Sequence, residues 1–264
     1  AAETAMRDDG WQPWSPDRRP ALPGLATVIG HRGAAGRAPE NTLAALRAAH
    51  ALGVRWVEFD VMLTADGVPV LIHDETLQRT TDGRGRVCRH TADAIRALDA
   101  GAWFAPRFRG EGVPTLEQAL ALLLELGLHA NVEVKPATGH AVATGETVAA
   151  VLRRVWPASG PTILVSSFER EALRAVRRVA PELPRGLLAG RLPPDWAVAM
   201  QELGCTTLHL DHRRLALRRL GELAGQGVPV LLYTVNAAER ARELLQAGAA
   251  AVFSDVPDAL LAAQ

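Results

Sequence analysis

The sequence has few cysteines and no long apolar run, and these absences narrow the classes of protein it can encode. Its two cysteines, Cys88 and Cys205, lie far apart and belong to no CxxC pattern. They argue against a disulfide framework or a cysteine-rich metal site and favour a reducing compartment. No apolar run approaches the roughly 20 residues of a membrane-spanning helix. We therefore expect a cytoplasmic protein without stable membrane association.

The chain also lacks an excess of either charge, since 29 lysine and arginine residues balance 29 aspartate and glutamate residues. Proteins that bind nucleic acid, or that are drawn to membranes by charge, carry clustered excess charge. The balance therefore argues against both kinds of partner. Apolar residues make up 48% of the 264 residues, an ordinary globular composition. This length suits one α/β barrel or two small domains.

Residues 1–25 are expected to form an amino-terminal arm ahead of one domain that spans residues 26–264. The arm is rich in tryptophan, proline, aspartate and arginine and has no apolar periodicity. Met6 is a candidate native start, with Ala1–Ala5 ahead of it, and the segment has no pattern typical of a signal peptide. We expect the arm to pack Trp11 or Trp14 against the domain.

From residue 26 onward, short apolar runs alternate with longer amphipathic segments. The runs predict nine strands, at Thr27–Ile29, Trp56–Leu63, Pro69–His73, Asn131–Val134, Thr162–Val165, Gly186–Leu188, Thr207–Leu210, Val230–Thr234 and Ala251–Phe253. The amphipathic segments predict helices at Thr42–Leu52, Thr115–Leu126, Thr144–Trp156, Glu169–Val179, Asp195–Leu203, Arg214–Ala224 and Ala237–Ala247. This alternation indicates an α/β fold with a parallel sheet. A (β/α)8 TIM barrel is its natural closed form, and a doubly wound open sheet is the competing architecture.

Two irregularities interrupt the alternation. A short link with the turn dipeptide Asp66-Gly67 joins the second and third predicted strands, which indicates a hairpin instead of a helical crossover. Nine strands exceed the eight of a barrel, so one of them is wrong or lies outside the barrel. Residues 75–114 are rich in glycine, arginine and threonine, and we expect them to form a small inserted cap after the third strand.

Acidic residues occur inside or at the ends of the predicted strands. Glu58 and Asp60 are two positions apart, so both point to one face of their strand, and Glu133 and Lys135 repeat this spacing at the fourth strand. In a barrel the carboxyl ends of the strands meet at one rim, where active sites lie. Buried acids are paired or bind metal, and three carboxylates suit Mg²⁺ or Ca²⁺. The alternative is a salt-bridge network centred on Lys135.

His31 and His73 lie at the ends of predicted strands, beside charged residues. The hairpin would bring His73 opposite Phe59 and Asp60. Two imidazoles titrate near neutrality and can supply one base and one acid for the cleavage of a phosphodiester. The other histidines are interpreted as surface or structural residues: His50, His90, His129, His140, His209 and His212.

Lys135 is the only lysine in a chain otherwise rich in arginine. A general codon bias toward arginine accounts for the scarcity, and the lysine that remains is typical of a tight site that does not fit a wide guanidinium. Arg32 can hold two phosphate oxygens, and Lys135 can offset the remaining charge. The alternatives are salt bridges from Arg32 to Glu40 and from Lys135 to Glu133.

In their order along the chain, these residues resemble the glycerophosphodiester phosphodiesterases, within the phospholipase-C-like phosphodiesterase superfamily. The motifs that carry the resemblance are His31-Arg32-Gly33, Pro39-Glu40-Asn41-Thr42, Glu58-x-Asp60, His73-Asp74, Leu77-x-Arg79-Thr80-Thr81-x-Gly83, Leu98-Asp99-Ala100-Gly101-x-Trp103-Phe104, Pro114-Thr115-Leu116, Glu133-x-Lys135 and Thr234-Val235-Asn236. The resemblance extends from about Val28 to Pro257. Two positions depart from it: Tyr233 replaces a frequent tryptophan, and Val256 replaces an arginine or aromatic residue.

The resemblance implies a phospholipase-C-like TIM barrel with an inserted cap. It also implies metal-dependent hydrolysis of glycerophosphodiesters, such as glycerophosphocholine or glycerophosphoethanolamine, to sn-glycerol 3-phosphate and an alcohol. By motif position, His31 and His73 would be the acid–base pair. The implied metal ligands, for Mg²⁺ or Ca²⁺, are Glu58, Asp60 and Glu133. The implied substrate contacts are Arg32 and Lys135 at the phosphate and Tyr233 near the glycerol group.

Several alternatives stay open at this point. A phospholipase D-type enzyme acting on lysophospholipids would need an apolar groove, which Trp103, Phe104 and Phe108 could line, although these side chains equally suit the core of the cap. A catalytically silent barrel that binds phosphate esters is disfavoured because both histidines are present. The nucleophile is either water or a hydroxyl of the substrate's own glycerol, which would give a cyclic phosphate. A monomer and a homodimer both fit the sequence.

Overall fold

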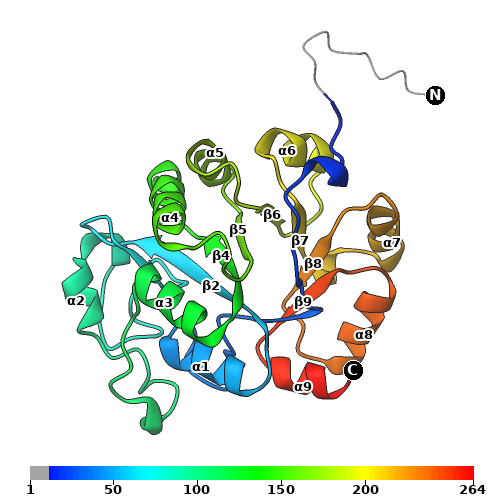
Figure 1. Cartoon of the computed structure of the whole chain (residues 1–264). Helices are drawn as coiled ribbons and strands as arrows, with labels where there is room; N and C mark the ends of the chain where they lie inside the picture. The colour runs from blue at the N-terminus through cyan, green and yellow to red at the C-terminus, as the bar shows by residue number, and fades with distance from the viewer. Residues whose placement is uncertain (1–11) are drawn as a thin grey trace.

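The computed structural model describes residues 12–264, and its central feature is a closed barrel of parallel strands surrounded by helices (Figure 1). The eight barrel strands are β1 (Val28–Gly30), β2 (Trp56–Leu63), β4 (His129–Val134), β5 (Ile163–Ser167), β6 (Arg185–Ala189), β7 (Thr207–Asp211), β8 (Val230–Tyr233) and β9 (Ala251–Ser254). β1 pairs with both β2 and β9, which closes the sheet. The prediction of a TIM barrel is therefore confirmed, and the open sheet is wrong.

Helices cover the outside of the barrel and join its strands (Figure 1). They are α1 (Leu43–Ala51), α3 (Leu116–Leu126), α4 (Ala141–Val155), α5 (Arg170–Val179), α6 (Trp196–Leu203), α7 (Leu217–Gly225), α8 (Ala238–Gln246) and α9 (Pro257–Ala262). Thr42 and Thr115, predicted as the first helical residues, are N-caps whose hydroxyls accept from the backbone N–H of Ala45 and Gln118. Only α9 was not predicted, because six residues are too few to show a helical period.

The extra strand of the sequence prediction is β3 (Pro69–Leu71), which lies outside the barrel. It pairs antiparallel with the end of β2, and Val61 lies opposite Leu71. The predicted hairpin is therefore present, but the strand ends at Leu71 and not at His73. After the bond from the Ile72 N–H to the Asp60 carbonyl, the chain leaves the ladder. His73 therefore lies just past the strand, where its side chain can turn toward the barrel mouth.

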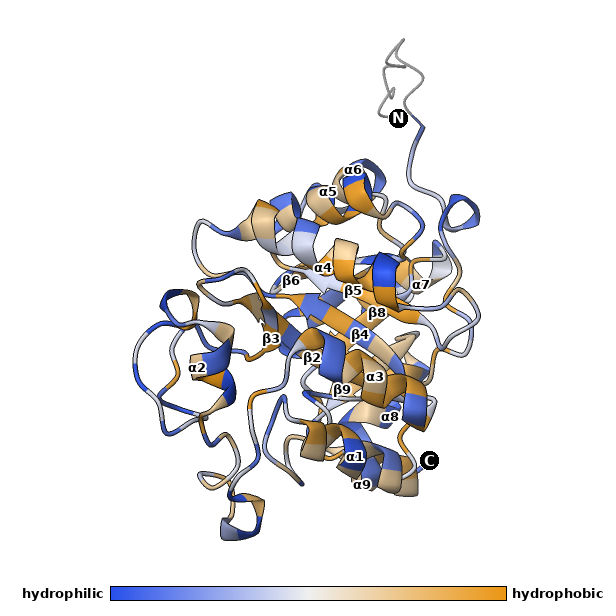
Figure 2. Cartoon of the chain, turned by 60° about the vertical axis from the view of Figure 1, so that its left-hand side comes forward, coloured by the Kyte–Doolittle hydropathy of each residue, from blue (hydrophilic) through white to orange (hydrophobic). Residues whose placement is uncertain are grey.

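Residues 75–114 leave the barrel between β3 and α3 and form a largely irregular excursion at its side (Figure 2). The excursion contains one α-helix and two 3₁₀ turns: α2 (Ala92–Arg96), η2 (Val87–Arg89) and η3 (Pro106–Phe108). Leu77, Val87 and Ile95 are buried in one cluster with Met62 and Val70 of the hairpin. The segment thus carries its own small core, which holds it against β2 and β3.

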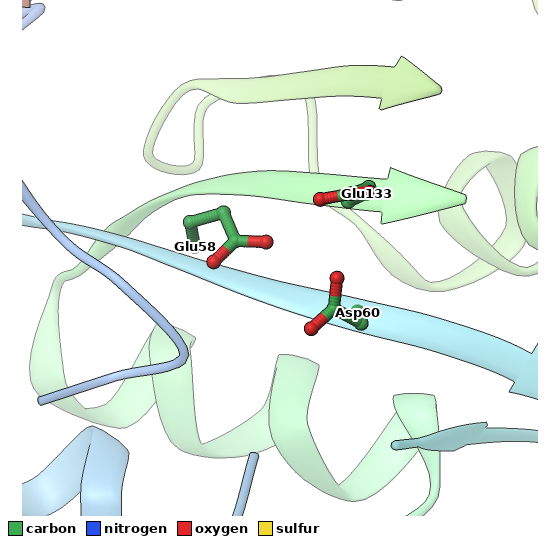
Figure 3. Close-up of side chains that lie close together, drawn as sticks. All are labelled: Glu58, Asp60 and Glu133. Atoms are coloured by element: carbon green, nitrogen blue, oxygen red, sulfur yellow. The ribbon is translucent and has the colours of Figure 1, made fainter. Parts of the chain in front are cut away.

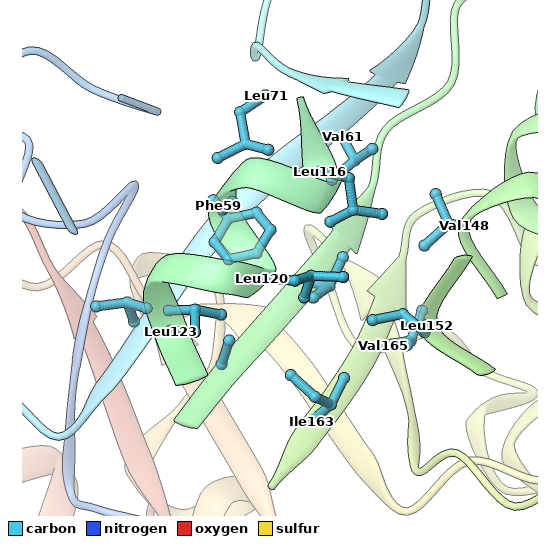
Figure 4. Close-up of a cluster of buried hydrophobic side chains, with 14 of the residues drawn as sticks. Phe59, Val61, Leu71, Leu116, Leu120, Leu123, Val148, Leu152, Ile163 and Val165 are labelled. Atoms are coloured by element: carbon cyan, nitrogen blue, oxygen red, sulfur yellow. The ribbon is translucent and has the colours of Figure 1, made fainter. Parts of the chain in front are cut away.

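The main apolar core lies between the barrel and its helices (Figure 4). Val57, Phe59 and Val61 point outward from β2 and are fully buried with Leu116 and Leu120 of α3. Burying such a side chain stabilises the fold by about 1.5–3 kcal/mol. Because side chains alternate along a strand, this outward packing turns the residues between them toward the barrel interior.

The described part of the arm covers the amino-terminal end of the barrel. Leu22 and Leu25 pack against the inner cluster that contains Trp56, whose Nε1 donates to the Gly24 carbonyl at 2.6 Å. The Trp14 indole donates to the Cys205 carbonyl at 2.8 Å. Met6, the candidate start, and Trp11, the other tryptophan expected to pack on the domain, lie outside the described residues. Within residues 12–264, no helix combines the length and apolarity needed to cross a membrane.

Candidate active site

A cavity of about 170 Å³ opens at the carboxyl ends of the barrel strands. Its lining has a charged side and an apolar side, formed by His31, Arg32, Glu58, Asp60, His73, Asn131, Glu133, Phe168, Leu188, His209, Tyr233, Thr234 and Phe253. Seven of the eight site residues predicted from the sequence and its resemblance therefore line one cavity, and Lys135 is the one that does not. The rule that strand ends converge at one rim accounts for this grouping.

The three predicted acids lie together on the floor of this cavity (Figure 3). β2 and β4 pair in a register that places Asp60 beside Glu133, and Glu58 lies two residues earlier on the same face. One carboxylate oxygen from each acid lies within 4.8 Å of the other two. Glu58 and Asp60 are only 2% and 1% exposed, so two of the three acids are almost completely removed from water.

The electrostatics of this cluster favour the binding of a cation. Burial and the neighbouring acids raise the pKa of Glu133 well above its ordinary value and raise that of Glu58 to about 7. Burial acts in the same direction on Asp60, but Arg32 and His73 beside it lower its pKa. The Glu58 Oε1 atom is buried and has no hydrogen-bond partner. Buried carboxylates with an unused oxygen suit a divalent cation that prefers oxygen atoms as ligands.

The alternative of a salt-bridge network centred on Lys135 does not match the geometry. Lys135 Nζ donates to the His73 carbonyl at 2.8 Å. Among residues 12–264, Lys135 takes part in no ion pair, neither with Glu133 nor with another acid. The ammonium instead binds the backbone of His73, a residue that lines the cavity.

His31 follows β1 directly, and a carboxylate holds its ring through Nδ1. Its Nδ1 lies 2.6 Å from Asp255 Oδ1, and its Nε2 lies 3.9 Å from Glu58 Oε2. Asn236 Nδ2 donates to the other oxygen of Asp255, and Asn236 Oδ1 accepts from the Asp255 N–H. Burial alone would lower the pKa of His31, but Asp255 and Glu58 raise it. The ring therefore turns Nε2 toward the acids.

His73 has a similar arrangement and lines the same cavity. Its Nδ1 lies 2.8 Å from Asp74 Oδ1, which leaves Nε2 for a substrate. Burial lowers the pKa of His73, although Asp60 and Asp74 act in the opposite direction. Each imidazole is thus bound through Nδ1 to a carboxylate, an arrangement that sets the tautomer and the orientation of the ring.

Arg32 forms the salt bridge to Glu40 that was the alternative to phosphate binding, and it also lines the cavity. Its Nη1 donates to Glu40 Oε2 at 2.7 Å, and its Nε lies 3.4 Å from Asp60 Oδ2 without hydrogen-bond geometry. Its backbone N–H donates to Glu58 Oε2, in a turn where φ of Arg32 is 51°. The turn thus aims the guanidinium at the acid cluster, with donors left for an anion.

Tyr233 contributes an apolar wall to the cavity. Its hydroxyl donates to the Ala189 carbonyl at 2.8 Å, and its ring meets Phe168 edge to face at 6.2 Å. The hydroxyl therefore binds the backbone of β6, and the ring faces the cavity. Trp103, Phe104 and Phe108 of the inserted segment contact one another and are absent from the cavity lining. They do not form an apolar groove at this site.

Sequence reasoning missed the residues that hold the two histidines. Asp255 directly follows β9 and Asn236 lies three residues past β8, so the same rule of strand ends would have found both. Asp74 and Asn236 belong to the motifs of the resemblance, but no role was attached to them. His209 was interpreted as a structural or surface histidine, and its fully buried place in the cavity lining follows from its inward position on β7.

The burial of His209 should make the stability of the fold depend on pH. Its Nε2 lies 2.7 Å from Thr207 Oγ1, and burial lowers its pKa to about 3. The folded chain keeps this ring neutral, whereas the unfolded chain binds a proton below a pKa of about 6.5. The free energy of unfolding is therefore expected to fall as the pH drops from about 6.5 toward 3, by about 1.4 kcal/mol per pH unit from this residue.

Urea unfolding at about pH 7 and about pH 5 measures this loss, and His209→Gln is expected to remove about 2 kcal/mol of it. His50→Gln, on the exposed side of α1, is the matched control and should retain the pH dependence of the unaltered chain. An equal loss in the His209→Gln and unaltered chains would contradict the neutral, buried state of His209.

The family to which the chain belongs follows from its comparison with known proteins. The model of the glycerophosphoryl diester phosphodiesterase family matches residues 31–259. The chain belongs to this family. The match begins at His31 and includes the acid cluster and both histidines.

Individual members of the family match nearly the whole chain. A glycerophosphodiester phosphodiesterase of Caldanaerobacter subterraneus subsp. tengcongensis is 34% identical over 89% of this chain and 96% of its own length. A phosphodiesterase of Oleispira antarctica, solved with the product sn-glycerol-3-phosphate, has a TM-score of 0.88 and 37% identity, over 90% of this chain and 96% of that one. A glycerophosphodiester phosphodiesterase of Agrobacterium tumefaciens has a TM-score of 0.75 and 30% identity, over 90% and 100%.

The family places this barrel among the phosphoric diester hydrolases. Its activity is that of a glycerophosphodiester phosphodiesterase, and the cavity with its acids and histidines is the candidate active site. The resemblance noted from the sequence motifs is thereby confirmed.

Proposed function

We infer that this glycerophosphodiester phosphodiesterase needs a divalent cation and cleaves its substrates to sn-glycerol 3-phosphate and an alcohol by means of two histidines. The observation that carries this is the meeting of the acid cluster with His31 and His73 at one cavity. Hydrolysis of a phosphodiester needs a base for the nucleophile, an acid for the leaving alkoxide, and positive charge near the phosphate. The cavity offers a candidate for each need.

Glu58, Asp60 and Glu133 would hold the cation. A set of oxygen donors suits Mg²⁺ or Ca²⁺, which are hard cations, more than metals that prefer sulfur or nitrogen. When bound, the cation supplies Lewis-acid charge that offsets the negative charge of the phosphate. The unused Oε1 of Glu58 and the raised pKa of Glu133 support this site.

His31 and His73 would share the proton transfers. One imidazole would take the proton of the attacking hydroxyl or water, and the other would protonate the departing alkoxide. Their places in the lining of one cavity, each with Nδ1 on a carboxylate, support the pairing. Arg32 would bind the phosphate with its free donors, and the charge of Lys135 would act from behind His73.

A small, polar substrate fits the cavity better than an acylated lipid. The cavity holds about 170 Å³, and the aromatic residues of the inserted segment do not extend it. The ring of Tyr233 would pack against the glycerol group. The structural neighbour from Oleispira antarctica carries sn-glycerol-3-phosphate, which supports the same product here. The unpaired Cys88 and Cys205 support a reducing compartment such as the cytoplasm, and residues 26–264 would act as one domain.

A panel of substrates tests the proposal directly. The purified chain, supplied with Mg²⁺ or Ca²⁺, is incubated with glycerophosphocholine, glycerophosphoethanolamine and lysophosphatidylcholine, and the released sn-glycerol 3-phosphate and the released choline or ethanolamine are both measured enzymatically. We expect sn-glycerol 3-phosphate and the alcohol from the first two substrates, and little choline from the lysolipid. A preference for micellar lysophosphatidylcholine would favour a phospholipase D-type enzyme, and inactivity on all three with either metal would favour a silent binding barrel.

A further inference from the structure

A chain of alternating charges connects His73 to Arg32 across the rim of the cavity. Asp74, which holds His73 Nδ1, accepts from Arg79 Nε at 2.7 Å and from Arg79 Nη2 at 3.0 Å. The same guanidinium donates to Glu40 Oε1 at 2.8 Å and to Glu40 Oε2 at 2.9 Å. Glu40 in turn accepts from Arg32 Nη1 at 2.7 Å. Arg79 is therefore the central link between a histidine and an arginine of the site.

The burial of these side chains makes the link more than a surface ion pair. Glu40 is 9% exposed at its side chain and Asp74 is 27% exposed, whereas Arg79 is 45% exposed. Arg79 belongs to the inserted segment, while Glu40 precedes α1 and Asp74 follows β3. One side chain thus joins the start of the inserted segment to Glu40, which lies 39 positions earlier in the sequence.

The chemistry of a guanidinium explains why arginine occupies this position. Its planar fork carries five N–H donors, and Arg79 uses two edges of the fork to bind two carboxylates at once. An ammonium is a compact charge and cannot bind two carboxylates in this way. Lysine would therefore retain the charge at this position without retaining both links.

We propose that Arg79 is a positioning residue that holds His73 through Asp74 and Arg32 through Glu40, so that both keep one arrangement around the phosphate. The inference rests on the proposed function, because it concerns the roles of His73 and Arg32. It adds a contribution of the inserted segment to the reaction without any contact between Arg79 and the substrate.

The removal of Arg79 has two separable consequences. Asp74 loses two hydrogen bonds and holds the ring of His73 less firmly, which lowers kcat. Glu40 also loses two hydrogen bonds but stays largely buried, so Arg32 becomes its only charged partner. The Glu40 carboxylate then draws the guanidinium of Arg32 away from the phosphate, which raises KM. Substitutions of residues that orient catalytic groups reduce activity by about tenfold to hundredfold. We expect Arg79→Gln to reduce kcat/KM within this range.

The test is a comparison of Arg79→Gln in two backgrounds, with kcat and KM measured on glycerophosphocholine and saturating Mg²⁺. In the otherwise unaltered chain we expect a loss of at least tenfold in kcat/KM, and a smaller loss for Arg79→Lys. In a chain that already carries Asp74→Asn and Glu40→Gln, Arg79→Gln should change kcat/KM by less than about twofold, because interactions through shared partners are not additive. Asp74→Asn alone should mainly lower kcat, and Glu40→Gln alone should mainly raise KM.

Arg86→Gln is the matched control, since Arg86 lies on the same segment and forms a single ion pair of 3.8 Å with Glu75. We expect it to stay within about twofold of the unaltered chain. Circular dichroism and thermal unfolding show whether each variant folds. Where a background is too slow to assay, calorimetric binding of sn-glycerol 3-phosphate replaces kinetics, and Arg79→Gln should weaken that binding severalfold only when Glu40 is present.

Two results would overturn the proposal. One is an equal loss from Arg79→Gln in both backgrounds, which would show that Arg79 does not act through Asp74 and Glu40. The other is a folded Arg79→Gln variant with unchanged kcat, KM and product binding. An unaltered chain that is inactive on every diester would instead count against the proposed function, so the two failures are distinguishable.

Discussion

Replacement of His31 by alanine is expected to lower kcat on glycerophosphocholine by about 10²- to 10⁴-fold, the usual contribution of a general acid or base. The structure explains why no neighbour could substitute. Asp255 holds Nδ1, Nε2 lies 3.9 Å from Glu58 Oε2, and His73 is bound to a carboxylate of its own, Asp74. His73→Ala is expected to cause a loss of the same size.

The double variant sharpens this prediction. If the two rings act in one proton-transfer sequence, the His31→Ala and His73→Ala losses should not multiply, because groups that act as a unit are strongly non-additive. His50→Ala, on the exposed side of α1, controls for the loss of a histidine as such. Near-normal turnover of folded His31→Ala and His73→Ala chains would remove both residues from the mechanism.

The second large effect expected is the loss of activity on chelation, with recovery when Mg²⁺ or Ca²⁺ is added. The buried acids at Glu58, Asp60 and Glu133 repel one another, and the pKa of Glu133 is raised by burial and by the other two acids. A cation that binds only the folded chain should also stabilise it, by about 2.7 kcal/mol at a concentration a hundred times its Kd. The melting temperature should therefore rise when metal is added.

Glu133→Gln separates this metal site from a purely structural network. Burial and the neighbouring acids oppose the ionised form of Glu133, and the amide cannot ionise, so the metal-free variant should unfold at a higher temperature than the metal-free unaltered chain. The variant should also lose activity and show little rise in melting temperature with metal. Thermal unfolding with and without Mg²⁺ measures both effects, independently of turnover. Activity that survives exhaustive chelation, with no effect of metal on melting, would contradict a metal site.

Much of the barrel was predictable from local pattern. The alternation of short apolar runs and amphipathic segments located all nine strands and the helices that follow them, apart from α9, and it predicted the hairpin of β2 and β3. Spacing by two on β2 and β4 identified Glu58, Asp60 and Glu133 as neighbours on one face. These features depend on residues close in sequence or on the alternation of side chains along a strand. Both kinds of feature can be predicted from the sequence alone.

The support for the catalytic groups was far less predictable. Asp255 lies 224 positions from His31, and Arg79 lies 39 positions from Glu40, so no local period relates them. The salt bridge between Arg32 and Glu40 was considered only as an alternative, and the pairing of Lys135 with the His73 carbonyl was not considered. Such contacts depend on how loops at the barrel mouth close, and loops carry no repeating pattern from which their path can be predicted.

By itself, then, the sequence determined the class of fold, the face on which the acids lie and the types of residue available for chemistry, because hydrophobic alternation and strand spacing are local properties. The tertiary structure decided that the barrel closes through β1 and β2, that β3 lies outside it, and which partner each ring and each guanidinium takes. Those outcomes depend on distances between segments that only the packed chain brings together.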